Sequence, residues 1–134
     1  MGWLARLIAW FRRPTPPTPP SRIERFDAAE VISIMNTERG AKLTRLRADP
    51  RLMSLAHDWA ARMANTDTLA HGDLPPIVGG EVIAAGQGSS DAVVASWMGS
   101  PKHRAIILTA GYQFAGVGRA VSASGVPYWC ADFA

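Results

Sequence analysis

The fold of this chain is decided by a stretch near its C-terminal end, residues 97–104, with the sequence WMGSPKHR. The Ser-Pro pair at 100–101 is typical of a helix start, because a hydroxyl residue suits the N-cap and proline suits the first helical position. This predicts that His103 lies in the first turn of a short helix. His71 and Glu81 stand upstream, each at the edge of an apolar element. Two imidazoles and a carboxylate suit a zinc site or an acid–base site, although spacing alone also allows all three to be ordinary caps of helices and turns.

Composition indicates a single globular domain behind a basic leader. The chain has 134 residues, of which 48% are hydrophobic and 19% charged, which is typical of a folded protein. Residues 1–26 carry five arginines and one glutamate, whereas residues 27–134 carry nine basic and ten acidic residues. The globular part therefore has no excess of positive charge that would favour binding to nucleic acid, and we expect no nucleic-acid partner. The single cysteine, Cys130, excludes an intramolecular disulfide, and its apolar neighbours predict a buried strand residue instead of a nucleophile.

The first 13 residues are predicted to form a short amphipathic or apolar leader helix. Its apolar run is about half as long as a bilayer span, so it fits an interfacial helix, a docking helix or an atypical uncleaved signal. One face of this helix would carry Trp3, Leu4, Leu7, Ile8 and Phe11. Residues 14–21 form a Pro-rich linker with five of the chain's ten prolines, which we interpret as an extended passive spacer. The remaining residues, 22–134, form the globular domain.

Three further helices are predicted from capping residues that precede apolar runs. Asp27 with Glu30 suggests a capping box, the Asp-Pro pair at 49–50 opens a second helix, and Ser89 or Ser90 caps a third. The second helix carries an apolar stripe at helical spacing, made of Leu52, Leu55, Ala56, Trp59, Ala60 and Met63.

The tryptophans of these helices are predicted to be core residues and not ligand platforms. Trp59 lies inside the apolar stripe of its helix, and Trp97 faces inward with its apolar neighbours. His57 falls opposite the stripe of the second helix, so we expect a solvated side chain and leave it out of the site.

The strands are shorter and cluster at the C-terminal end. Residues 81–85 are predicted to be extended, and residues 114–121 and 126–133 are predicted to form a terminal hairpin. Gly116 and Gly118 would let backbone approach closely in the sheet, and the alternative is a bulge or bend at these positions. Helices that flank strands without a βαβ order indicate an α+β fold.

Taken together, these segments resemble the bacterial branch of the CAP superfamily, also called SCP-like domains. The resemblance covers about residues 27–134 and rests on the order of its pieces. These are MNTER at 35–39, DPRL at 49–52, LAH at 69–71, GEVIA at 80–84, WM at 97–98, SPKHR at 100–104, GVG at 116–118 and YWCADF at 128–133. It implies an α-β-α sandwich with a small central antiparallel sheet.

The resemblance also implies a metal site. Many members of the family have two histidines and two acids in a central cleft, and some bind Zn²⁺ there. Here His71 matches the first histidine, Glu81 the acid of the Gly-Glu motif, and His103 the histidine of the Ser-Pro-x-His-Arg motif. The second acid is replaced by Ser100. Three ligands predict a weak site for a divalent metal such as Zn²⁺ with an open coordination position.

The expected function is binding, in a domain that is non-enzymatic or not demonstrably enzymatic. We expect the His/Glu cleft to hold a metal and to take a lipid or envelope ligand. We expect residues 1–13 to tether the domain to a membrane surface or a protein assembly. Such a protein would be membrane-surface, extracytoplasmic or virion-associated, and not free in the cytoplasm. One alternative is a metal-assisted, peptidase-like hydrolase that uses the same three residues, and another is a structural component of a phage or envelope assembly with a vestigial cleft.

Overall fold

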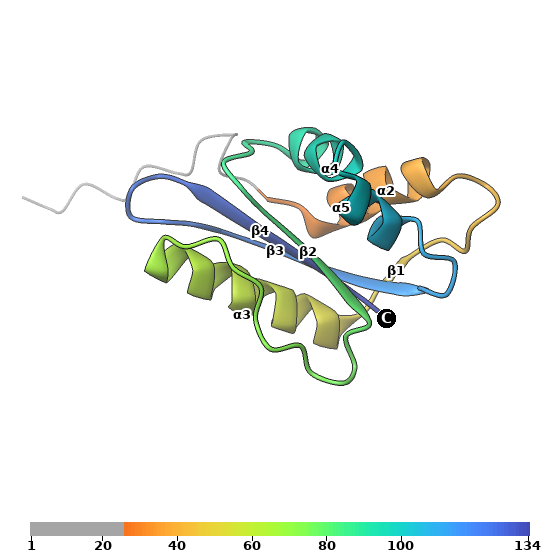
Figure 1. Cartoon of the computed structure of the whole chain (residues 1–134), viewed down its shortest axis with the longest axis horizontal. Coiled ribbons are helices and arrows are strands. Elements are labelled where there is room, and N and C mark those ends of the chain that lie inside the picture. The colour runs from red at the N-terminus through yellow and green to blue at the C-terminus, as the bar shows by residue number, and fades with distance from the viewer. Residues whose placement is uncertain (1–25) are drawn as a thin grey trace, which may run out of the picture.

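A computed structural model of the chain describes residues 26–134, so the predicted leader at 1–13 and linker at 14–21 lie outside the described residues. The described part is a sandwich in which a four-stranded sheet lies between α3 on one face and α2, α4 and α5 on the other (Figure 1). The helices are α2 (Ala28–Arg39), α3 (Pro50–Thr66), α4 (Ser90–Met98) and α5 (Pro101–Ile107). The strands are β1 (Arg47–Ala48), β2 (Gly80–Ala85), β3 (Phe114–Val121) and β4 (Pro127–Phe133). The predicted α+β class and α-β-α layering are confirmed. Within residues 26–134, no helix combines the length and the apolar character that a bilayer span requires.

The sheet has the strand order β1-β3-β4-β2. The three longer strands pair in antiparallel fashion, and the hairpin of β3 and β4 begins and ends within one residue of its prediction. The strand β1 was not predicted, because its two residues, which pair in parallel with β3, are too few to show a period. The central sheet is therefore antiparallel except at this edge.

Local capping explains where the helices begin. Asp49 accepts hydrogen bonds from the backbone N–H groups of Arg51 and Leu52, at 2.9 and 3.1 Å, and the Ser89 hydroxyl accepts one from Ala92 at 3.1 Å. Such bonds satisfy N–H groups that have no partner in the first turn of a helix. Ser100 occupies the predicted N-cap position of α5, but its side chain makes no capping hydrogen bond.

Two glycines allow α3 to lie directly against β3. A Cβ atom on Gly116 would stand 2.1 Å from the backbone carbon of Leu52, and one on Gly118 would stand 2.4 Å from the carbonyl oxygen of Ala56. Ordinary contacts between carbon atoms begin near 3.5 Å. The close approach predicted from these glycines is confirmed, and it fixes the distance between α3 and the sheet.

On the other face, one buried arginine holds the end of α5 in place. The Arg39 guanidinium donates hydrogen bonds to four backbone carbonyls, those of Thr44, Ile107, Thr109 and Tyr112, at 2.8 to 3.1 Å. Arg39 is only 4% exposed. It therefore joins the C-terminal end of α2 to the segment that follows α5, and so fixes the helix that carries His103.

Candidate functional site

His71 and Glu81, two of the three predicted site residues, are in direct contact. Glu81 is the second residue of β2 and its side chain is 4% exposed, whereas His71 lies in the loop before β2 and its side chain is 58% exposed. His71 Nδ1 stands 2.9 Å from Glu81 Oε1. The contact is an ion pair when the imidazole is protonated and a hydrogen bond when it is neutral. The pair thus joins a fixed carboxylate to an accessible imidazole.

A tryptophan holds the loop that carries His71. Trp59 Nε1 donates a hydrogen bond to the carbonyl oxygen of Ala70 at 2.9 Å, and Gly72 packs so closely that a Cβ atom there would lie 2.8 Å from the Trp59 ring. The position of His71 between these two anchors explains how an exposed loop residue stays beside Glu81.

His103, the third predicted residue, lies on the first turn of α5 and is partly buried. Burial first, and then the charge of His71, lower the pKa of His103 below its usual value. The two histidines are therefore near enough to interact electrostatically, and His103 is neutral at physiological pH. Among residues 26–134, however, the one group whose three metal-ligand atoms all lie within 4.8 Å of one another contains neither histidine.

That compact group consists of Glu81, Cys130 and Asp132, all of them buried. Glu81 is the direct register partner of Asp132 in the β2–β4 pair, and Cys130 shares a face of β4 with Asp132 because side chains alternate along a strand. The Cys130 sulfur stands 3.6 Å from Glu81 Oε2 and 3.6 Å from Asp132 Oδ1. Asp132 was not predicted as a site residue, although an acid within the apolar run of the last strand is a signal that points to it.

The electrostatics of this group favour protonated forms. Burial, followed by the neighbouring Glu81, raises the pKa of Asp132 to about 7. Burial, and then the charges of Asp132 and Glu81, raise the pKa of the Cys130 thiol. Cys130 is fully buried in β4, which confirms the predicted strand position and leaves a thiol that is not a nucleophile on its own.

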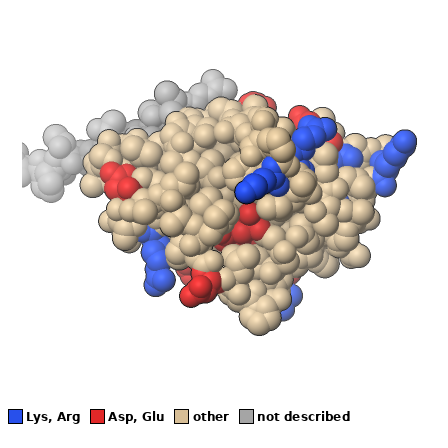
Figure 2. Space-filling model, in the orientation of Figure 1, with Lys and Arg blue, Asp and Glu red and all other residues tan. Residues whose placement is uncertain are grey.

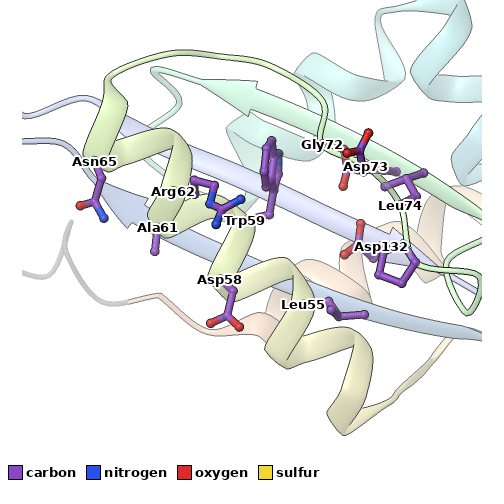
Figure 3. A pocket seen from close by; sticks show the side chains of 12 residues that line it. Leu55, Asp58, Trp59, Ala61, Arg62, Asn65, Gly72, Asp73, Leu74 and Asp132 are labelled. Carbon is purple, nitrogen blue, oxygen red and sulfur yellow. The ribbon is translucent and has the colours of Figure 1, made fainter.

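Glu81 and Asp132 form part of the wall of a groove of about 450 Å³ between α3 and the loop before β2 (Figure 3). The prediction that Trp59 is a core residue holds in part, because Trp59 packs against a buried core cluster but is itself only half-buried and lines this groove with Leu55. The buried residues of α3 are Leu52, Ala56, Ala60, Met63 and Ala64. Leu55 and Trp59 belong to the same apolar stripe but lie at its edge, where the sheet does not fully cover them. On the face viewed in Figure 2, acidic atoms lie in a hollow near the middle of the molecule and basic side chains lie beside it.

Two other expectations can be checked directly. His57 is exposed on α3, as predicted for a residue outside the site. Trp97 is buried and donates a hydrogen bond from Nε1 to the carbonyl oxygen of Ile83 at 3.1 Å, which confirms it as a core residue.

The chain matches the sequence model of the CAP, or cysteine-rich secretory protein, family over residues 5–133. No curated protein sequence matches it. An outer surface protein from Borrelia burgdorferi has a similar structure, with a TM-score of 0.65 and 19% identity over 81% of this chain and 94% of that one. An extracellular protein containing an SCP domain from Bacillus anthracis str. Ames has a TM-score of 0.67 and 20% identity over 89% of this chain and 44% of that one. NaASP2, solved with Zn²⁺, has a TM-score of 0.63 and 13% identity over 88% of this chain and 82% of that one. At these identities the likeness concerns the fold alone.

Proposed function

This chain belongs to the CAP family, and we propose that it is a binding domain that holds a divalent metal such as Zn²⁺ in its groove. The observation that carries the proposal is the 2.9 Å contact between His71 Nδ1 and Glu81 Oε1. An imidazole nitrogen and a carboxylate oxygen are ordinary zinc ligands, and here they lie side by side, with Glu81 in the wall of the groove. The structure of NaASP2, a protein of the same fold, contains Zn²⁺, which supports the choice of metal.

His103 is the third proposed ligand. Its lowered pKa keeps the imidazole neutral, which is the form that binds metal. Because His103 stands outside the compact group of ligand atoms, metal binding through His103 requires a rearrangement that brings its imidazole closer to His71 and Glu81. We therefore expect weak affinity and a coordination position left open for water or for a group of the bound ligand.

Calorimetric titration with Zn²⁺ of the metal-stripped full chain tests this function. We expect the His71→Ala and His103→Ala variants each to bind Zn²⁺ at least about tenfold more weakly than the wild type. His57→Ala is the matched control, because it removes an exposed histidine of α3 and should leave binding unchanged. Equal affinity in the wild type and in the double variant that lacks both His71 and His103 would refute the proposed site.

We further propose that the ligand is a lipid or envelope component and that the protein acts outside the cytoplasm, held there by residues 1–13. The groove combines an apolar side formed by Leu55, Trp59 and Leu74 with the acidic Glu81 and Asp132, a combination that suits an amphipathic ligand. Two proteins of the same fold are described as an outer surface protein and an extracellular protein, which supports the location.

A further inference from the structure

We infer that Glu81, Cys130 and Asp132 form a second, inner metal position at the groove, with two carboxylates and one thiolate as ligands. It goes beyond the proposed function because neither histidine is a ligand. The two positions share only Glu81, which can serve both because Oε1 contacts His71 and Oε2 faces Cys130.

The spacing of the donor atoms fits a tetrahedral metal ion. Zinc–sulfur bonds of about 2.3 Å and zinc–oxygen bonds of about 2.0 Å, at a tetrahedral angle, separate the sulfur and oxygen atoms by roughly 3.5 Å. The Cys130 sulfur stands 3.6 Å from one oxygen of Glu81 and 3.6 Å from one oxygen of Asp132. All three donor atoms lie within 4.8 Å of one another. Little rearrangement is needed to bring them around one ion.

The sheet holds these donors in place. Asp132 lies between Glu81 on β2 and Gly116 on β3 in the strand register, so its backbone is paired on both sides. Gly116 in turn lies directly beneath α3. Ligands on a paired strand are placed more accurately than ligands on a loop. The inner position is therefore preorganised, whereas the outer one depends on the His71 loop.

The cluster also lacks positive charge. The single thiol hydrogen of Cys130 faces two carboxyl oxygens and can be donated fully to only one of them. Among the ion pairs of residues 26–134, His71 is the sole partner of Glu81, and none joins Asp132 to a lysine or arginine. Buried carboxyl groups are neutralised by protonation, paired with a cation or coordinated to a metal, and here, within residues 26–134, no lysine or arginine supplies the cation.

Binding of a divalent ion would compensate the negative charge of the buried carboxylates. The ion would take the place of the thiol proton and of the proton that Asp132 holds below its raised pKa, both of which leave to the solvent through the groove, and its two positive charges would offset two of the three negative charges of the thiolate and the carboxylates. Glu81 and Asp132 line the groove, which would give the ion a path of entry from the solvent. The contact from His71 to Oε1 orients the Glu81 carboxylate so that Oε2 faces the ion.

Cobalt(II) titration of the metal-stripped full chain, in a phosphine reductant free of thiols, tests the inference. A cobalt–thiolate bond gives a charge-transfer absorption band in the near ultraviolet. Because the chain holds a single cysteine, such a band in the monomeric protein reports Cys130 alone. We expect the band to saturate at one cobalt per chain in the wild type and in His103→Ala. We expect it to disappear in Cys130→Ser and to need at least about tenfold more cobalt in Asp132→Asn.

The outcomes separate this inference from the proposed function. Cobalt that binds the wild type without a thiolate band, and is lost in His71→Ala and His103→Ala, would overturn the inner position and leave the outer one intact. A thiolate band that survives in both histidine variants would support the inner position, and the Zn²⁺ titration of the same variants decides separately whether His71 and His103 are ligands of the outer one. No binding of cobalt to the folded wild type would overturn both. Since the wild-type spectrum alone decides whether sulfur is bound, the result does not depend on whether every variant folds.

Discussion

Adding one methyl group at Gly118 should separate α3 from the sheet and weaken the whole fold. A Cβ atom there would stand 2.4 Å from both the carbonyl oxygen of Ala56 and the backbone nitrogen of His57. Since ordinary contacts begin near 3.5 Å, α3 has to move outward by about 1 Å. Backbone atoms cannot turn aside as a side chain can, so we expect the upper end of the cost of overpacking, about 3 kcal/mol of unfolding free energy.

Urea denaturation and thermal melting, both followed by circular dichroism, measure this cost for Gly118→Ala. In a domain of this size a loss of about 3 kcal/mol lowers Tm by roughly 10 to 20 °C. Gly88→Ala is the matched control, because a Cβ atom on Gly88 meets nothing within 4 Å. Its unfolding free energy should stay within about 0.5 kcal/mol of the wild type. A Gly118→Ala protein as stable as the Gly88→Ala control would refute the close packing of α3 on β3.

Three more predictions concern the rest of the molecule. Arg39→Ala leaves four backbone carbonyls without their hydrogen-bond donor and should lower the unfolding free energy, measured in urea, by at least about 3 kcal/mol. Arg39→Lys should restore only part of that free energy. An Arg39→Ala variant as stable as the wild type would contradict the role of Arg39 in holding the end of α5. The pKa of Asp132 is about 7 in the native state against 3.8 in the unfolded state, so between these values the native state binds one more proton. The stability of the metal-free protein should therefore fall as the pH rises from about 4 to 7. An equally steep fall in Asp132→Asn would show that another group is responsible. Deleting residues 1–20 should leave Tm nearly unchanged and abolish flotation with lipid vesicles, because buried apolar side chains are worth about 1.5 to 3 kcal/mol each; a large loss of stability would show instead that this segment packs on the domain.

The elements that could be predicted from the sequence are those fixed by local chemistry. The Asp49 carboxylate accepts hydrogen bonds from N–H groups two and three residues further along the chain, so the start of α3 depends only on residues that are close in sequence. The hairpin of β3 and β4 likewise depends on two neighbouring apolar runs and the turn between them. The strand β1 could not be predicted, since its two residues are held only by pairing with β3.

The site was only partly predictable because its geometry depends on contacts between distant segments. The match of His71 and Glu81 to a family motif named two residues that do meet. Trp59 was assigned to the core because an apolar stripe does not reveal which of its edges the sheet covers. Asp132 was missed because its partnership with Glu81 arises from the β2–β4 register, which joins residues about 50 positions apart.

The groove has one rigid side and one adjustable side, and this division decides how a ligand can be recognised. Glu81, Cys130 and Asp132 are fixed by strand pairing and by the close contact of α3 with β3. His71 is an exposed loop residue, held near them by the hydrogen bond from Trp59 to Ala70 and by its own contact with Glu81. A metal bound at the inner position would therefore keep its place while the loop moved, and the loop would set access to its open coordination position. Specificity for the ligand should consequently reside in Trp59 and the loop, and affinity for a metal at the inner position in the sheet.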